Sequence, residues 1–215
     1  MRVVMGWVLS VLVVSTLGLG CAGAKSAQGV AAGPPVKDLY PLAVGHAWTY
    51  DVELLGEKRQ LNVEIVKQAE GFFVDNQGAK LRTDSTGVRD TQRYLLREPL
   101  HEGRKWMNVL SPSVTEHYQV TSVGRTCRTP AGEFLECVAV ESRTRANENG
   151  ILVNRMTFAT GVGLVESEVD LESAGKRIPQ SRLRLKSYRL AQGPTSEDKP
   201  VTTPSPQGRE SVGGR

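Results

Sequence analysis

Apolar and polar residues alternate along much of the chain, which is the pattern of β-strands that bury one face. Two such runs, HAWTYDVEL and KRQLNVEIV, lie close together in the sequence. Their apolar positions are Trp48, Tyr50, Val52 and Leu54 in the first run, and Leu61, Val63 and Ile65 in the second. A two-residue turn at Gly56-Glu57 would pair Trp48 with Ile65 and place both apolar sets on one face. We predict an antiparallel hairpin here.

The middle of the chain continues this pattern, and helical periodicity is almost absent. Phe134–Ser142 and Ile151–Phe158 have the pattern of strands, and the turn dipeptide Asn149-Gly150 lies between them. The segment FFVDNQGAKLRTDSTGVRD adds short strands separated by Gly78 and Gly87. We therefore predict an all-β domain over residues 38–190, built as a single antiparallel, meander-like curved sheet or open half-barrel.

Two charged stripes lie near the end of this domain. One is acidic (Glu166, Glu168 and Asp170), and the other is basic (Arg182, Arg184 and Lys186). A hairpin with Asp170 opposite Arg182 would also place Glu168 opposite Arg184 and Glu166 opposite Lys186. Val169 and Leu183 would then lie on the opposite, buried face. The stripes are interpreted as self-complementary pairing; the alternative is a basic site for anionic lipid or polymer.

One eight-residue pattern occurs twice, as PLAVGHAW (residues 41–48) and PLHEGRKW (residues 99–106). Proline suits the approach to a strand, glycine supplies a turn or bulge, and tryptophan then buries a large surface in the sheet. The repeat is interpreted as a device that starts strands. The alternative is an aromatic groove for an apolar ligand, with the candidate residues Trp48, Tyr50, Trp106 and Phe158.

The first residues of the chain have the pattern of a secretory signal peptide. Arg2 precedes an apolar run that ends in LGLG, directly before Cys21. This arrangement resembles the lipobox of bacterial lipoproteins and predicts a signal peptide over residues 1–20 and lipidation of Cys21. Ordinary signal-peptidase cleavage, or retention as a membrane anchor, is the alternative. Ala22 follows the cysteine, which by the sorting rule of enteric bacteria implies the outer membrane.

Small and polar residues dominate on both sides of the predicted domain. We predict a flexible tether over residues 21–37 and a disordered tail over residues 191–215, which is rich in Pro, Ser, Thr and Gly. Without Arg2 the formal charge falls from +4 to 26 − 23 = +3, since the whole chain has 27 basic and 23 acidic residues. So weak an imbalance argues against nucleic acid as a partner.

With Cys21 lipidated, Cys127 and Cys137 remain as a pair in an oxidising compartment. A turn at Pro130-Ala131 with Gly132 as a bulge would place Cys127 opposite Leu135 and Cys137 opposite Arg125. The two cysteines would then be diagonal neighbours, at about 7–8 Å between Cα atoms. That distance is slightly beyond the usual range of about 4.4–6.8 Å, but twist at the bulge could close the gap. We predict a structural disulfide.

Three segments, YPLAVGHAWTYDV, TPAGEFLECVAV and TFATGVGLVESE, together resemble a group of uncharacterised bacterial envelope lipoproteins and secreted proteins. The shared pattern is YPLxxGxxWxY, then TPAGxFxxC, then GVGLV, and the likeness covers about residues 40–168. The resemblance implies an antiparallel β-domain in the cell envelope. It implies no activity and no catalytic residues.

The sequence gives little support for an enzyme. It has no GxSxG, HExxH or phosphate-binding glycine loop, and His46, His101 and His117 form no zinc pattern with the cysteines. We predict no catalytic residues, no metal and no cofactor. The expected function is a non-catalytic interaction or structural module of the envelope, bound to the membrane by its lipid anchor and open to an envelope protein partner. The alternative is a carrier for a lipid or another apolar ligand.

Overall fold

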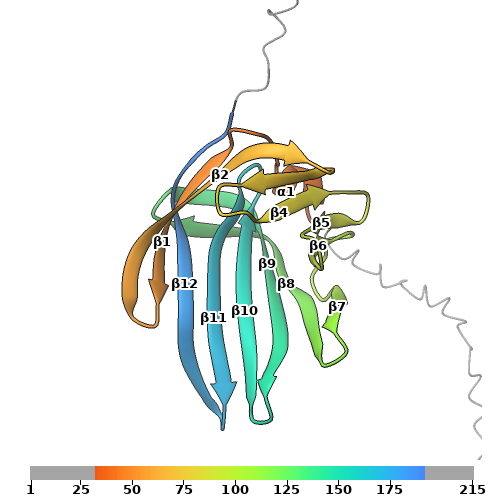
Figure 1. The fold of residues 1–215 in the computed structure, drawn as a ribbon, viewed down its shortest axis with the longest axis vertical. Helices are drawn as coiled ribbons and strands as arrows, with labels where there is room; N and C mark the ends of the chain where they lie inside the picture. Colours follow the sequence, from red (N-terminus) through yellow and green to blue (C-terminus); the bar gives the residue numbers. More distant parts are fainter. Residues whose placement is uncertain (1–31, 192–215) are drawn as a thin grey trace, which may run out of the picture.

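The computed structural model describes residues 32–191, which form one short helix and twelve strands (Figure 1). The elements are α1 (Val36–Leu39), β1 (Ala47–Leu54), β2 (Glu57–Ala69), β3 (Phe72–Asp75), β4 (Lys80–Thr83), β5 (Gly87–Arg89), β6 (Tyr94–Arg97), β7 (Lys105–Ser111), β8 (Val114–Thr129), β9 (Gly132–Asn147), β10 (Gly150–Ala159), β11 (Gly163–Ser173) and β12 (Lys176–Arg189). They form one antiparallel sheet in the order β6-β5-β4-β3-β2-β1-β12-β11-β10-β9-β8-β7. This confirms the predicted all-β fold.

The sheet curls until its two edge strands, β6 and β7, come together. The indole N–H of Trp106 donates to the carbonyl of Tyr94 at 3.0 Å. The side-chain amide of Asn108 accepts from the N–H of Tyr94 and donates to its carbonyl, each at 3.1 Å. Side chains therefore bridge the gap that a backbone ladder would fill in a closed barrel, and the result is a nearly closed barrel-like sheet.

The folded domain begins earlier than the sequence predicted. Ala32 forms a bridge with His101, and the N–H of Gly33 donates to the carbonyl of Leu100 at 2.5 Å. Val36 and Leu39 are buried, at 1% and 0% exposure, on one side of the single turn of α1. Residues 32–37 were predicted as tether and belong to the domain instead. The predicted signal peptide, Cys21, the rest of the tether and residues 192–215 of the tail lie outside the described residues.

The β1–β2 hairpin exists, but its predicted register was wrong. The turn is Leu55-Gly56, so Leu54 pairs with Glu57 and Trp48 pairs with Val63. Leu55 and Gly56 both have positive φ (49° and 90°), as a type I′ turn requires. We predicted glycine in the first turn position, and the chain places it second. The shift is two residues, so the apolar sets still share one face.

The acidic and basic stripes also pair two residues away from the predicted register. Glu168 lies opposite Arg182 and Glu166 lies opposite Arg184, so the predicted pairing of Glu168 with Arg184 was wrong. The β11–β12 turn is again tight, because Ala174 and Gly175 both have positive φ. An irregularity between Val169 and Asp170 then sets Asp170 opposite Pro179.

Both copies of the repeated eight-residue pattern form the same backbone structure, as predicted for a device that starts strands. Gly45 and Gly103 have nearly equal positive φ angles, 87° and 85°. Each donates its N–H to a neighbouring strand, Gly45 to the carbonyl of Ile65 at 2.8 Å and Gly103 to that of Val120 at 2.9 Å. In both copies the strand begins one residue before the tryptophan.

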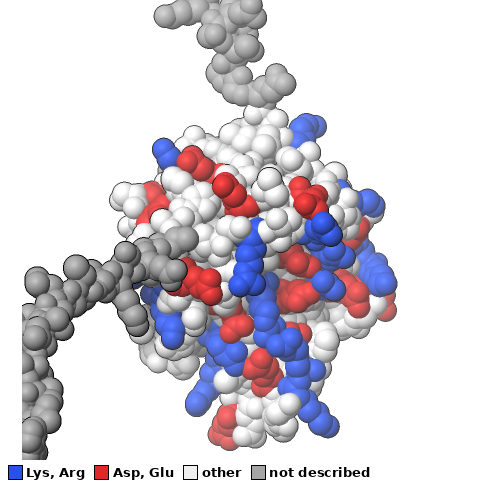
Figure 2. All heavy atoms as spheres, turned by 180° about the vertical axis from the view of Figure 1, so that it is seen from behind, with Lys and Arg blue, Asp and Glu red and all other residues white. Residues whose placement is uncertain are grey.

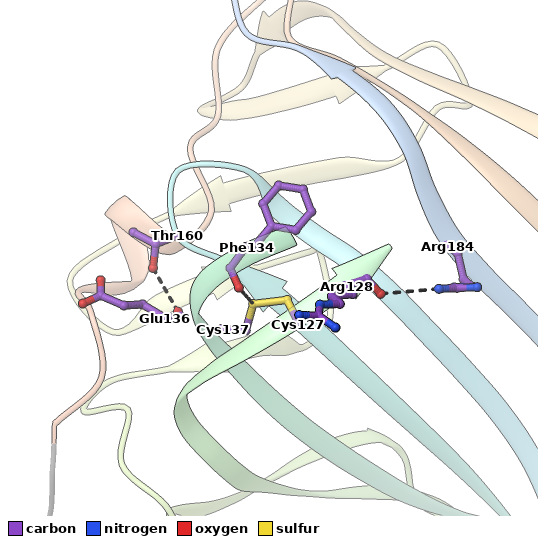
Figure 3. Close-up of a disulfide and its surroundings, with 7 residues drawn as sticks. All are labelled: Cys127, Arg128, Phe134, Glu136, Cys137, Thr160 and Arg184. Atoms are coloured by element: carbon purple, nitrogen blue, oxygen red, sulfur yellow. Dashed lines mark hydrogen bonds between the residues drawn. A yellow bond between two sulfur atoms is a disulfide. The ribbon is translucent and has the colours of Figure 1, made fainter. Parts of the chain in front are cut away.

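Cys127 and Cys137 form the predicted disulfide, with 6.1 Å between their Cα atoms (Figure 3). The turn is shorter than predicted, since Thr129 pairs with Gly132 and Cys127 pairs with Phe134 rather than with Leu135. The extra residue lies instead between the cysteines as a bulge, where Glu136 has a φ of 55°. The bulge brings the two cysteines within bonding distance.

The end of the β8–β9 hairpin folds against distant parts of the sheet. The N–H of Ala131 donates to the carbonyl of Leu185 at 3.0 Å, and Arg184 donates to the carbonyl of Arg128 at 3.4 Å. The hydroxyl of Thr160 donates to the carbonyl of Glu136 at 3.2 Å (Figure 3). The disulfide therefore stabilises a hairpin end that closes one end of the core.

Candidate functional site

The two faces of the long strands carry opposite kinds of side chain. Because side chains alternate along a strand, the strand pairing assigns each residue to a face. We call "the charged face" the one that carries Glu53, Lys58, Glu141, Arg143, Arg155, Glu166, Glu168, Asp170, Glu172, Arg182 and Arg184. We call "the uncharged face" the opposite side of β1 and β8–β12, where two charged side chains lie in the part of the chain that the structure describes: Glu116 on β8, and Lys176 at the start of β12.

Charges of opposite sign alternate across the charged face. One row of directly paired residues runs through six neighbouring strands: Lys58, Glu53, Arg182, Glu168, Arg155 and Glu141. Arg155 contacts Glu141 at 3.2 Å and Asp170 at 2.7 Å. The mixture of signs is visible from behind the molecule (Figure 2). The stripes therefore pair with each other, as we predicted, and leave no large area of one sign for an anionic ligand.

The larger hollows of the described surface lie mainly on this charged face. One of about 350 Å³ is lined by Glu141, Arg155, Glu166 and Glu168, among others. These side chains already form ion pairs, Arg155 with Glu141 and Glu166 with Arg182. The charged groups are therefore engaged with each other, and we interpret the hollow as the surface of an ion-pair network.

The uncharged face carries exposed aliphatic side chains near the turns of the β1–β2, β9–β10 and β11–β12 hairpins, which we call "the tip end" of the sheet. Leu152, Leu171 and Ile178 are direct neighbours on β10, β11 and β12. Leu152 is 37% exposed and Ile178 is 45% exposed. In the next row, Val169 on β11 and Leu54 on β1, which is 42% exposed, lie on either side of Ser181. We call these five aliphatic side chains "the apolar patch".

The groups that border the apolar patch are mostly polar and uncharged, although Glu57 lies beside Leu54 and Lys176 lies two residues before Ile178. Asn154 pairs with Val169 and with Ser142, and its side-chain carbonyl accepts a hydrogen bond from the hydroxyl of Ser167 at 2.9 Å. Thr144 lies beside Leu152 on the next strand. The site therefore combines aliphatic surface with hydroxyl and amide groups, and its chemistry is that of a docking surface.

Beyond this patch, the same face is buried in two clusters. The first contains Val36, Leu39, Val88, Leu96, Leu100, Trp106, Tyr118, Val120, Val138, Val140, Met156 and Phe158, and the second contains Trp48, Tyr50, Ile65, Cys137, Ala159, Val162, Val165 and Leu185. Figure 1 shows β2–β6 crossing this end of the sheet, while the tip ends of β9–β12 extend beyond them. The exposed patch is the part of the uncharged face that these strands leave open.

The four aromatic residues predicted as a groove lie inside these clusters. Trp48, Tyr50, Trp106 and Phe158 are 4%, 4%, 6% and 1% exposed, and they divide between the two clusters. The Trp48 indole donates to the carbonyl of Val162 at 2.8 Å, and the Tyr50 hydroxyl donates to that of Leu164 at 2.9 Å. The structure therefore places them in the core and not along an open groove. The apolar hollow beside Trp48 has a volume of only about 30 Å³.

The single acidic side chain of the uncharged face is neutralised where the sheet nearly closes. Glu116 is 8% exposed, contacts Arg93 at 2.7 Å and accepts a hydrogen bond from Tyr118 at 2.9 Å. Loss of hydration, and next the charge of Glu116, raises the pKa of Tyr118 well above its ordinary value. Desolvation alone would lower the pKa of Arg93, but Glu116 and Tyr118 raise it overall. Both carboxylate oxygens are satisfied, so we interpret this cluster as structural.

Residues 32–191 provide no group of three or more His, Cys, Asp or Glu side chains arranged to hold a metal ion. Within the same range, no helix has the length and apolar character that crossing a membrane requires. We take the apolar patch as the candidate site because Leu152, Ile178 and Leu54 are exposed there. Sequence reasoning missed it, because Leu152, Leu171 and Ile178 have the same alternation as core residues.

Neither a family model nor a curated protein matches the chain. Two solved structures are similar in fold. One, from Bacteroides fragilis, is described as an exported protein with a YmcC-like fold; it has 14% identity and a TM-score of 0.42, covering 71% of this chain and 99% of that chain. The other, from Parabacteroides distasonis, is described as a lipoprotein; it has 11% identity and a TM-score of 0.37, covering 70% of this chain and 98% of that chain. Likenesses this distant carry no functional argument.

Proposed function

We propose that this protein is a lipid-anchored, non-catalytic module of the bacterial outer membrane that docks an envelope protein on its apolar patch. The observation that carries the proposal is the row Leu152, Leu171 and Ile178, in which Leu152 and Ile178 are exposed and Leu171 is half-buried, on a face with few charged side chains. Contiguous apolar surface exposed to water is costly, and in soluble domains it marks interaction sites. The run LGLG before Cys21 supports the lipid anchor.

The composition of the surface around the apolar patch favours a protein over an acyl chain as the partner. Asn154 lies directly beside Val169, and Thr144 lies directly beside Leu152. An acyl chain would cover these groups without offering hydrogen bonds, and an unsatisfied buried polar group costs about 1–3 kcal/mol. A protein surface supplies both apolar contacts and hydrogen-bonding groups.

The position of the apolar patch suits docking by an anchored protein. The patch lies at the tip end of the sheet, whereas the ends of the described chain lie elsewhere: Ala32 pairs with His101, and Ala191 lies beside Gly45. A partner can therefore approach the tip end while the chain is held at its N-terminal side. The alternative, a carrier for an apolar ligand, would need a deeper hollow than the 30 Å³ beside Trp48.

Native mass spectrometry of the full chain, extracted from its own membrane, tests the docking proposal. Leu152→Lys places a charge on the apolar patch, and Ile151→Lys is the matched control, because Ile151 is 39% exposed on the charged face. We expect a protein partner with the wild type and the control, and at least a tenfold loss with Leu152→Lys. Equal capture by both variants would refute the docking site, and a bound mass of lipid size would favour the carrier function.

The anchor is tested separately. Cys21→Ser should shift the protein from the detergent phase to the aqueous phase, because serine lacks the sulfur that would carry the lipid and the variant loses the acyl chains that hold it to the membrane. Unchanged partitioning would refute lipidation and would leave the docking proposal standing.

A further inference from the structure

The edge strand β7 is exposed and apolar on a face that is otherwise charged. Met107 and Val109 are 58% and 65% exposed, and they point to the charged face, where Met107 lies beside His117 and Val109 beside Thr115. On its other side β7 carries Trp106 and Asn108, which are buried against β6. The strand is therefore fixed in place through the side chains that contact β6, while Met107 and Val109 stay exposed on the other face.

The backbone of β7 has pairing capacity on its outer edge. β7 pairs with β8 alone, and it ends the sheet. Among the described residues, no backbone hydrogen bond joins Trp106–Leu110 to any element other than β8. Figure 1 shows β7 at the margin of the molecule. Every second residue of such an edge presents a free N–H and C=O, which can template a further strand.

The two edges of the sheet differ in their protection. β6 has four residues and carries Arg97 at its end, and short length and charge are the usual means of blocking an edge. β7 has seven residues, and Lys105 at its start is the one charged side chain on it. β7 thus lacks the protection that β6 has.

We infer that β7 pairs antiparallel with β7 of a second copy of this chain, with the two-fold axis at Asn108. The sequence KWMNVLS fits itself in this register, because Met107 lies opposite Val109 of the second copy, and the reverse. Both exposed apolar residues are then covered by each other. The bulge between Val109 and Ser111 limits the regular pairing to the residues around Asn108, and Lys105, the one charged side chain of β7, does not face Lys105 of the second copy.

This surface is separate from the apolar patch, since Met107 and Val109 lie on the charged face. Pairing at β7 leaves the tip end of both copies accessible. The contact joins the two sheets into one continuous sheet, in the manner of β-augmentation. The inference therefore stands whether or not the apolar patch docks a partner.

Cysteine cross-linking in the native membrane tests the register. We expect a disulfide-linked dimer when copies carrying Met107→Cys are co-expressed with copies carrying Val109→Cys. Each single variant alone should cross-link at least tenfold less, because its own position lies diagonally across the axis. Dimers at equal yield from every combination would overturn the register.

Charge-swapped variants test the contact itself without cross-linking. Met107→Lys with Val109→Lys sets lysines opposite lysines, and the corresponding double glutamate variant sets glutamates opposite each other. We expect each to be monomeric by native mass spectrometry, and an equal mixture to form heterodimers. Val66→Lys is the control for charge at an exposed apolar site, since Val66 is 49% exposed on β2. A monomeric wild type, dimers of the variants alone, or no dimer in the mixture would overturn the inference.

Discussion

Two neighbouring residues on β10 experience opposite environments. Val153 lies on the charged face and is 0% exposed, whereas Leu152 lies on the uncharged face and is 37% exposed. The reason is that Arg143 on β9 forms an ion pair with Glu172 on β11. That pair crosses β10 and covers Val153 with the long side chains. On the uncharged face the short side chains around Leu152 cannot cover it. Long charged side chains thus cover Val153 on the charged face, whereas Leu152 on the uncharged face stays exposed to water.

We expect the largest difference in the free energy of unfolding between the two faces when aspartate replaces each of these two residues. Val153→Asp puts a carboxylate beneath the ion-pair network beside Asp170, and we expect a loss of about 3 kcal/mol or more in the free energy of unfolding. Leu152→Asp should change it by about 1 kcal/mol or less, because that side chain reaches water. Chemical denaturation of the two variants measures both values, and equal losses would contradict the face assignment.

The next largest loss of stability should come from the end of the β8–β9 hairpin, which closes one end of the core. Replacing Cys127 and Cys137 together by alanine removes a crosslink between residues 10 apart in sequence. We expect a loss of about 2–3 kcal/mol in the free energy of unfolding. Alkylation without reductant provides the check on the starting material: the wild-type peptide should take up no label at either cysteine.

The ion-pair network of the charged face gives a smaller effect. Arg155 contacts Glu141, Asp170 and Glu172, and Asp170 is only 7% exposed. Arg155→Ala leaves Asp170 with Arg177 alone, so we expect a loss of about 2 kcal/mol. Arg145→Ala, at an exposed position of the same face, should stay within about 0.5 kcal/mol. A loss for Arg145→Ala as large as that for Arg155→Ala would argue against a specific network.

The smallest effect is a dependence on alkaline pH. Burial, then the charge of Glu116, raises the pKa of Tyr118 above the ordinary 10.0. The folded state therefore holds this proton longer than the unfolded state does. The resulting stability is fully present below pH 10 and is lost as pH rises further, by about 1 kcal/mol at half a pH unit above 10. Denaturation curves against pH should decline less steeply for Tyr118→Phe, and equal slopes would contradict the assignment.

Much of the fold was predictable because side chains alternate along strands. Alternation gave the strands 134–142 and 151–158 and put Trp48 and Tyr50 on one face. The registers were less predictable. The turn of the β8–β9 hairpin was shorter than predicted, and the β1–β2 and β11–β12 hairpins were each two residues off. Their turns place Leu55 and Ala174 in the left-handed conformation before a glycine, and neither residue type signals that conformation. A shift of two preserves the faces, so the error did not affect the fold class.

The candidate site was not predictable in the same way. Ile178 and Leu171 occupy strand positions that look like core positions in the sequence. Whether such a residue is buried depends on how far β2–β6 extend over the sheet, which is a property of the tertiary structure. The aromatic residues that we predicted as a groove show the opposite error, because they were expected to be accessible and are buried. Large aromatic side chains give the most burial, and so Trp106 and Phe158 lie in the core.

The central claim is that a partner docks on the apolar patch, and a photo-crosslinking amino acid at Leu152 tests it most directly. The matched position is Ile151, which is 39% exposed against 37% for Leu152 and lies on the opposite face. In intact cells we expect a discrete adduct of protein size from position 152, and at least tenfold less from position 151. Equal adducts from both positions, or none from position 152, would contradict the account.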